Sequence, residues 1–382
     1  MRIFLVIFIV TVSLIASNWE DYIENDSLRS SVMRNLSELG NSRDIYEEIL
    51  IEADDEILEG VAFLIANSPA SMLLGMNPDS FLIEVGLAYE TRKSFPWGKD
   101  IPNELFLHYV LPNQVSQETP TFYRGYFLDE LRPILDTVET GSEAAIAVNY
   151  WCGQRVRFEQ TQRQDQGVFH TLASGYGRCE EMMIVYVSAL RAVGIPAREA
   201  WTPYWATGDN NHAWTELWAD GDWHYSGSCE PKPSLDNAWF NNTAKRAAVI
   251  MSSAFGVPQT DEELYRVRDH YAIINSMPNY IEEPSFLIVD TDSESTDVYI
   301  AVFNFGALRP IMRQNTGDST SVSFTMGYGD FMVYAGDEHR FDWAVVNTEF
   351  GEETRVVLNP RENGNMGDEK FWLRYPAEPD RE

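Results

Sequence analysis

The 382-residue sequence predicts an α+β protein, and three stretches with different periodicity support this prediction. Apolar residues recur at helical spacing between residues 18 and about 95. The run from Cys179 to Val193 is apolar on nearly every side, as in a buried helix, and two strand-like runs follow it. From about Ser285, short strand-like runs alternate with polar turns, which is typical of a small β-sandwich.

These patterns divide the chain into five parts. Helical patterns return at residues 127–151 and again, for the most part, at 234–280, while residues 152–178 are polar and loop-like. We therefore expect a signal peptide at 1–17, a helical N-terminal region at 18–124, a core at 125–280, a β-sandwich at 283–360 and a polar tail at 361–382.

The chain is strongly acidic, with a formal net charge of -31. A surface of this charge repels phosphate backbones and anionic headgroups, so neither nucleic acid nor a membrane surface is an expected partner. The apolar content of 44% is ample for buried cores, and extensive disorder is not expected. The simplest interpretation of the charge is solubility.

The N-terminus has the pattern of a secretory signal. Arg2 supplies a positive charge, and an apolar run from Ile3 to Ala16 precedes a polar, acidic stretch. The run is short for a membrane-spanning helix. We expect cleavage near Ala16 or Ser17 and a secreted or periplasmic protein that has no membrane contact after cleavage; a retained N-terminal anchor is the alternative.

Three cysteines, at positions 152, 179 and 229, leave at least one thiol unpaired. One arrangement bridges Cys152 to Cys229 and leaves Cys179 free. The other arrangement, which we prefer, keeps all three thiols reduced and buried.

Cys179 is the candidate nucleophile because it opens the predicted helix directly after the glycine-rich turn GYGRC. The unpaired N–H groups of a first helical turn favour a thiolate and can hold a developing oxyanion. Glu180 and Glu181 oppose the thiolate, so the end of the helix cannot activate the sulfur alone. The site therefore needs a base.

His212 is the best candidate for that base. It starts a run, NHAWTELWA, in which alternate residues share a face of a strand. One face carries His212, Trp214, Glu216 and Trp218, and the other carries Ala213, Thr215, Leu217 and Ala219. If the cysteine helix packs face to face on the histidine strand, thiol and imidazole come within hydrogen-bond reach, as nucleophilic catalysis requires.

The order of these motifs resembles a papain-like transglutaminase core, in which a helix bearing the cysteine packs on an antiparallel sheet. The resemblance covers about residues 125–240 and is carried by GRCEEMMIVYVSALRAVGIPAR and DNNHAWTELWADGDWHYSGSCEP. The final CEP is similar to the peptide N-glycanase branch of this superfamily. The resemblance implies Cys179 as nucleophile, His212 as base and an acid on the neighbouring strand.

The chain departs from the family pattern at the acid, because Gly227 occupies the usual position. A bulge at Gly227 would shift the register and bring Glu230 to His212, so Glu230 is the predicted third member. A Cys–His pair without an acid, or an acid from another loop such as Asp236, remains open. Glu216 lies on the histidine face but about 13 Å along the strand.

The resemblance also implies an oxyanion donor upstream of the cysteine, from a tryptophan or glutamine. Trp151 and Gln154 are the nearest matches.

The implied activity is that of an exported thiol-dependent hydrolase or acyltransferase. Cys179 would attack a peptide, glutamine or glycosyl-asparagine amide and form a thioester, which water or an amine resolves. Hydrolysis is favoured because the resemblance is to compact microbial members, many of which are hydrolases.

No metal or organic cofactor is implied. The expected partner is a polypeptide or glycopeptide, and the β-sandwich is expected either to contact carbohydrate or to brace the core. The alternative is a catalytically silent binding or scaffold protein of the same fold.

Overall fold

The computed structural model describes residues 19–161, 164–362 and 364. The predicted signal peptide and most of the predicted polar tail lie outside these residues. The chain forms two compact units, one up to Leu82 and one from Ile83 onward.

The first unit is helical, as the sequence predicts. Its elements are η1 (Trp19–Tyr22), α1 (Asp26–Glu38), η2 (Gly40–Ser42), α2 (Arg43–Glu52), α3 (Leu58–Asn67), α4 (Ala70–Gly75) and the start of α5 (Pro78–Ser94). Asn25 caps α1 by accepting hydrogen bonds from the amides of Ser27 and Leu28. Helix α3 is almost entirely buried and forms the centre of the unit.

The second unit contains a six-stranded antiparallel sheet in the order β5-β4-β3-β6-β8-β7. Its strands are β3 (Ala197–Thr202), β4 (His212–Ala219), β5 (Asp222–Ser226), β6 (Met251–Phe255), β7 (Glu263–Val267) and β8 (Tyr271–Asn275). The helices of this unit are η3 (Pro96–Asp100), α6 (Asn103–Tyr109), α7 (Arg124–Leu135), α8 (Gly141–Gly153), α9 (Val168–Ser174), α10 (Cys179–Ala192) and α11 (Asn241–Ala244). A short parallel pair, β1 (Arg157–Phe158) and β2 (Tyr176–Gly177), precedes α10.

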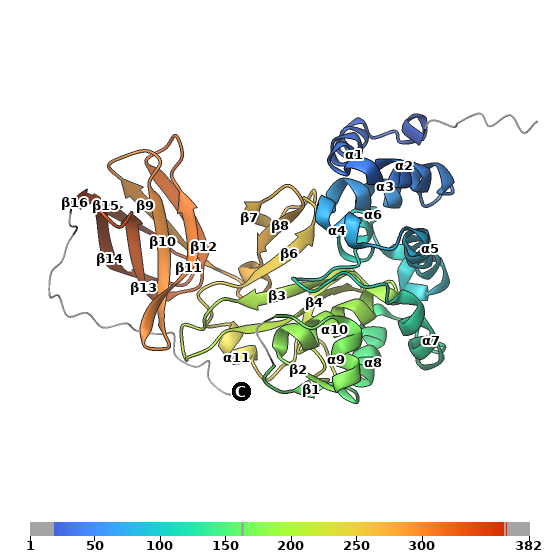
Figure 1. Ribbon diagram of the computed structural model, residues 1–382. Coiled ribbons are helices and arrows are strands. Elements are labelled where there is room, and N and C mark those ends of the chain that lie inside the picture. Colours follow the sequence, from blue (N-terminus) through green and yellow to red (C-terminus); the bar gives the residue numbers. More distant parts are fainter. Residues whose placement is uncertain (1–18, 162–163, 363, 365–382) are drawn as a thin grey trace, which may run out of the picture. The chain divides into compact units, whose positions relative to one another are not determined.

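Helix α10 is the centre of the core, and α7, α8 and α9 pack around it while it lies against β3 and β4 (Figure 1). It begins at Cys179 and ends before Gly194, whose φ of +80° suits a residue without a side chain. Its buried residues share one hydrophobic cluster with Leu217 and Ala219 of β4. The predicted buried helix is confirmed.

Strands β4 and β5 form the predicted hairpin. Asp220 and Gly221 both have positive φ, as a two-residue turn requires. The register pairs Ala219 with Asp222 and Trp218 with Trp223, as expected.

The prediction that residues 234–280 are mostly helical is wrong. Within the described part of this segment, only α11 and the 3-10 turn η4 (Met277–Asn279) are helical, and strands β6, β7 and β8 make up much of the rest. Strand β6 pairs with β3, a partner about fifty residues earlier in the chain. Because β-propensity depends on such distant partners, the local pattern did not reveal these strands.

The C-terminal region is β-rich, as predicted. One sheet has the order β11-β10-β13-β14-β16 and the other β12-β9-β15. All pairs are antiparallel except β9 with β15. The strands are β9 (Ser285–Thr291), β10 (Asp297–Asn304), β11 (Ala307–Asn315), β12 (Ser321–Met326), β13 (Gly329–Gly336), β14 (Arg340–Thr348), β15 (Glu353–Leu358) and β16 (Arg361–Glu362).

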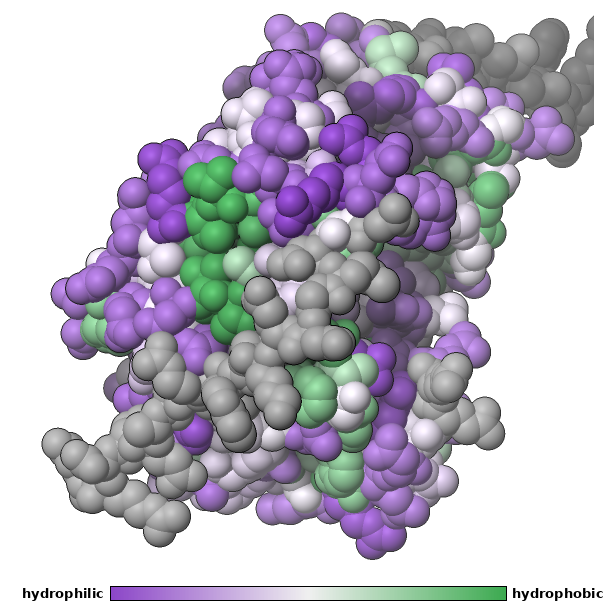
Figure 2. Space-filling model, turned by 90° about the vertical axis from the view of Figure 1, so that its left-hand side faces the viewer, coloured by the Kyte–Doolittle hydropathy of each residue, from purple (hydrophilic) through white to green (hydrophobic). Residues whose placement is uncertain are grey.

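Inward residues of both C-terminal sheets join one hydrophobic cluster, so the sheets pack face to face as a sandwich. Phe324 of β12 and Val333 of β13, one from each sheet, are both fully buried in it. Figure 2, which views the molecule from the side of this module, shows a mainly hydrophilic surface with a large hydrophobic patch and smaller hydrophobic areas.

Candidate active site

A cavity of about 540 Å³ lies at the N-terminal end of α10. Three of the residues singled out from the sequence, Cys179, His212 and Glu230, line it together. A second cavity of about 620 Å³ adjoins the first, and the two share four lining residues: Arg178, Glu180, Asn211 and Ala213. Cys179 therefore lies beside a junction from which space extends in two directions.

The turn before α10 is fixed by a buried carboxylate. Glu181 accepts hydrogen bonds from the amide of Arg178 at 2.8 Å, the hydroxyl of Thr161 at 2.7 Å and the amide of Gln166 at 3.2 Å. A side chain at Gly177 would lie 2.9 Å from Cβ of Glu181, so glycine is required for this close approach. These contacts hold the start of the helix and present Cys179 to the cavity.

The Cys179 thiol is protonated at rest. Its Sγ donates a hydrogen bond to Oε2 of Glu180 at 3.2 Å. Burial, followed by the negative charge of Glu180, raises the pKa of Cys179 to about 12, although the backbone N–H of Ala213 at the sulfur opposes this rise. The end of the helix therefore does not activate the thiol by itself, in agreement with the inference that a base is needed.

His212 is the first residue of β4 and is 9% exposed. Its ring lies 4.9 Å from the ring centroids of both Trp239 and Phe240, and 5.7 Å from that of Trp214. Its Nε2 is buried without a hydrogen-bond partner among the residues described. Burial lowers the pKa of His212 to about 4, against the charge of Glu180, so the imidazole is neutral at pH 7 and can accept a proton.

Helix α10 packs on β4, as expected, but it covers the leucine and alanine face of the strand and not the face that carries His212. Leu217 and Ala219 belong to the cluster around α10, whereas Trp214, on the face of His212, belongs to the second hydrophobic cluster. The sulfur instead contacts the strand near its start, at the amide of Ala213. In the described structure no hydrogen bond joins Cys179 Sγ to the His212 ring.

Glu230 makes its contact with a tryptophan. Its Oε2 accepts a hydrogen bond from Nε1 of Trp239 at 2.8 Å, and the Trp239 ring packs on His212. The predicted bulge is not formed, because the β4–β5 ladder runs regularly up to the pair Thr215–Ser226 and the chain then turns, with a φ of +57° at Cys229. Glu230 therefore touches His212 only through Trp239.

Asp236 does not reach His212 either. Its Oδ2 lies 2.6 Å from Nδ1 of His224, on the neighbouring strand β5, and this partner raises the pKa of His224.

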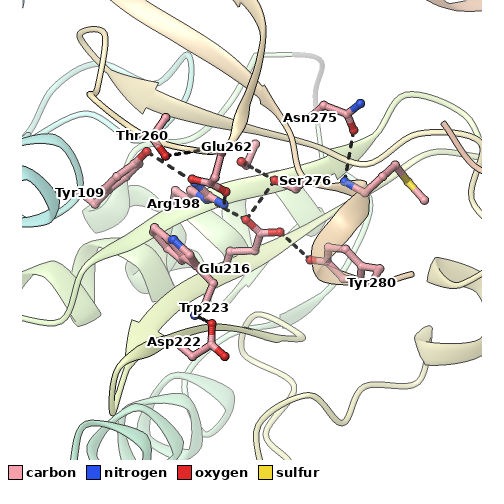
Figure 3. A network of polar contacts seen from close by, with 12 residues as sticks. Tyr109, Arg198, Glu216, Asp222, Trp223, Thr260, Glu262, Asn275, Ser276 and Tyr280 are labelled. Carbon is pink, nitrogen blue, oxygen red and sulfur yellow. Dashed lines mark hydrogen bonds and ion pairs between the residues drawn. The ribbon is translucent and has the colours of Figure 1, made fainter. Parts of the chain in front are cut away.

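Glu216 belongs to a separate buried network in the same sheet (Figure 3). It bonds Nε of Arg198 at 2.7 Å and accepts a hydrogen bond from Tyr280 at 2.9 Å. The Tyr280 hydroxyl also accepts a hydrogen bond from Nε1 of Trp214 at 2.7 Å, and Trp214 packs on His212. Arg198 ends the quoted motif GIPAR, but its pairing with Glu216 was not predicted, and Tyr280 belongs to no quoted motif.

The two predicted oxyanion donors do not line the cavity. Trp151 is buried on α8, where the guanidinium of Arg155 lies 3.8 Å from its ring, and Gln154 caps that helix. Gln160, which does line the cavity, was missed. It also is a glutamine upstream of the cysteine, so the same signal would have found it.

The three cysteines are free, as expected, but only Cys152 and Cys229 are buried, and Cys179 is partly exposed. Cys152 and Cys229 contact each other: burial first, and then a hydrogen bond from the Cys229 thiol to Cys152, raise the pKa of Cys229. Within the described residues there is no group of three histidine, cysteine or acidic side chains able to hold a metal ion. Among the same residues, no helix combines the length and apolar character needed to cross a bilayer.

Comparisons with known proteins find similarity over part of this chain. Residues 131–226 match the model of the transglutaminase-like superfamily. A solved structure, a "putative cysteine protease" from Cytophaga hutchinsonii, is similar at 16% identity with a TM-score of 0.29, over 48% of this chain and 68% of that one. The comparison with curated proteins gives no match. The part of the chain that carries Cys179 and His212 is thus similar to the transglutaminase-like superfamily.

Proposed function

We propose that the protein is a thiol-dependent enzyme that acts on amide bonds, with Cys179 as nucleophile and His212 as base. The observation that carries this proposal is the meeting of both side chains in one cavity, with the sulfur at the amide of the residue that follows His212. A neutral imidazole beside a protonated thiol is the starting state of general-base catalysis.

The first step is a change of hydrogen-bond partner. Substrate entering the cavity displaces the thiol from Glu180, and Sγ turns toward the unpartnered nitrogen of His212. His212 takes the proton, and the sulfur attacks the carbonyl carbon. The first amides of α10 and the amide of Ala213 are available to the developing oxyanion.

The second half of the reaction releases the amine. His212 returns the proton to the leaving nitrogen, and the acyl group stays on Cys179 as a thioester. Water then gives hydrolysis, and an amine gives acyl transfer. We favour hydrolysis by a peptidase or amidase.

The substrate we propose is a polypeptide or glycopeptide. The two adjoining cavities lie on either side of the lining residues that they share, next to Cys179, and this arrangement suits an extended chain. Trp205 and Trp239 line the first cavity and offer ring surfaces for a side chain or a sugar. We also propose export of the protein, on the strength of its N-terminal sequence.

A screen of the mature chain against peptides, glutamine donors and N-glycopeptides tests this proposal. We expect turnover of at least one class that disappears in Cys179→Ala and in His212→Ala. Turnover that survives in both variants would overturn the assignment.

A second candidate is a catalytically silent binding protein of the same fold. The high pKa of Cys179, its bond to Glu180 and the absence of an acid at His212 among the described residues favour it. The two candidates differ in the reactivity of Cys179. In a silent module, iodoacetamide labels Cys179 slowly, and the pH profile of the labelling rate shows no titration of a histidine.

A further inference from the structure

A hairpin of the C-terminal sandwich contacts the segment that leads into His212. Asn304, the last residue of β10, is fully buried. Its Nδ2 lies 3.0 Å from the carbonyl oxygen of Trp205, 2.9 Å from that of Gly208 and 3.2 Å from that of Asn210. Its Oδ1 accepts a hydrogen bond from the amide of Asn210 at 3.2 Å. One side chain therefore ties together the whole 205–210 segment.

Asn210, whose amide and carbonyl both bond to Asn304, has a strained backbone. Asn210 has a φ of +131°, a backbone conformation that residues with a side chain rarely adopt. Its amide and its carbonyl are both bonded to Asn304, and the carbonyl also accepts a hydrogen bond from the amide of Trp205 at 2.9 Å. Such a conformation persists only where the surroundings impose it.

The tip of the same hairpin adds a second contact. Phe305 and Gly306 have positive φ values of 49° and 70° and form the tight turn between β10 and β11. In this turn the amide of Phe305 donates a hydrogen bond to Oδ1 of Asp209 at 2.6 Å. Because Asp209 is exposed, this contact can be removed without opening a core.

The segment held in this way is a wall of the cavity and the approach to the candidate base. Trp205, at its start, stacks on Trp214 with a centroid distance of 6.1 Å and lies 6.3 Å from the ring of His212. Asn211, directly after its end, donates a hydrogen bond to Glu180 at 3.2 Å. The direction in which the chain leaves Asn210 thus fixes both Asn211 and His212.

We propose that the C-terminal module is a working part of the candidate site, and that Asn304 is a positioning residue that holds the 205–210 segment and thereby aligns His212 with Cys179. We call the hydrogen bonds between the Asn304 side chain and residues 205–210 the clamp. The effect on catalysis rests on the proposed function, whereas the clamp does not. This role requires no ligand on the sandwich.

The clamp is tested by hydrogen exchange in the full mature chain with three variants. Asn304→Ala removes the four side-chain hydrogen bonds of Asn304 to the segment, and Asp209→Ala removes only the bond to Phe305. Asn315→Ala is the matched control, since Asn315 lies on the adjacent strand β11 and its hydrogen bonds stay within the sandwich. We expect amide exchange of the 205–210 segment to rise about tenfold or more in Asn304→Ala, less in Asp209→Ala, and not in the control. Unchanged exchange in Asn304→Ala would overturn the clamp.

The effect on the site is tested by acetylation of Cys179 with p-nitrophenyl acetate, at a temperature where all variants remain folded. We expect the rate to fall about tenfold in Asn304→Ala and to stay within twofold of wild type in Asn315→Ala. If Asn304→Ala does not fold, Asp209→Ala supplies the test, with a smaller loss of the same sign. Faster exchange with an unchanged acetylation rate would overturn the positioning role. Absence of acetylation in the wild type would instead count against the proposed function, while exchange still decides the clamp.

Discussion

Two polar clusters lie on the same face of β4, and they differ in how completely their groups are paired. Around Glu216, the carboxylate, the Arg198 guanidinium and the Tyr280 hydroxyl all have partners within hydrogen-bond distance. Around His212, Nε2 has none in the described structure, and the Cys179 thiol is bonded to Glu180. Buried polar groups that support a fold are almost always satisfied. The unpaired imidazole beside a cavity is therefore the part of the strand that we assign to chemistry.

The comparison predicts that the largest effect on activity comes from the unpaired cluster. Cys179→Ala and His212→Ala should each reduce amide turnover by about 10³-fold or more, because nucleophile and base act as one unit. Their melting temperatures should stay near that of the wild type. His224→Ala, a change on the neighbouring strand outside the cavity, is the control and should retain activity within about twofold.

The paired cluster should show the opposite behaviour, with a large effect on stability. Glu216→Ala removes one of the two carboxylates that pair with buried Arg198 and should cost about 3–5 kcal/mol in the free energy of unfolding. Urea unfolding measures this loss. The double variant Arg198→Met with Glu216→Leu should recover much of it. A loss below about 1 kcal/mol in Glu216→Ala would show that the network is not structural.

The buried imidazole should make stability depend on pH. Burial lowers the pKa of His212 from 6.5 to about 4, so between these values the unfolded chain binds a proton that the folded chain does not. Stability is unaffected above pH 6.5 and falls as the pH drops toward 4, by up to about 3 kcal/mol. Urea titrations across this window should give a weaker pH dependence for His212→Gln. An identical slope in both proteins would contradict a buried, neutral imidazole.

Glu180 should control the reactivity of the thiol. Its charge and its hydrogen bond both raise the pKa of Cys179, so Glu180→Gln should lower that pKa and speed iodoacetamide labelling at pH 9 by about tenfold. Glu230→Gln changes a carboxylate in the same cavity that does not contact the sulfur, and it serves as the matched control. Equal labelling rates in both variants would show that Glu180 does not control the reactivity of Cys179.

The smallest effect is expected at Glu230. A carboxylate that orients the base directly would cost about 10⁴-fold when neutralised. Because Glu230 bonds Trp239 and not His212, Glu230→Gln should lose less than about tenfold. Trp239→Phe should lose a similar amount, and the double variant no more than either single change. A loss near 10⁴-fold would restore Glu230 as the acid of a triad.

Local signals were sufficient to predict the centre of the fold. The cysteine helix was predictable because it is apolar on all sides and because Gly194 ends it, and the β4–β5 hairpin because Asp220 and Gly221 suit its turn. The family resemblance paired Cys179 with His212, and the two residues line one cavity without a hydrogen bond between them in the described structure.

Long-range packing explains what the sequence did not reveal. Strand β6 lies between β3 and β8, and both partners are distant from it in the chain. Helix α10 packs on the alanine and leucine face of β4 and not on the histidine face. Glu230 Oε2 is bonded instead by Nε1 of Trp239, nine residues later in the chain, at 2.8 Å. None of these contacts leaves a periodic pattern in the chain.

The central claim is that His212 serves the Cys179 thiol, and acetylation of the mature chain by p-nitrophenyl acetate, read by mass spectrometry of the peptide that contains Cys179, tests it without a known substrate. The account predicts an acetyl group on Cys179 that is absent in Cys179→Ala and forms about 100-fold more slowly in His212→Gln. Acetylation of His212→Gln at the wild-type rate, or acetylation confined to other residues, would contradict it.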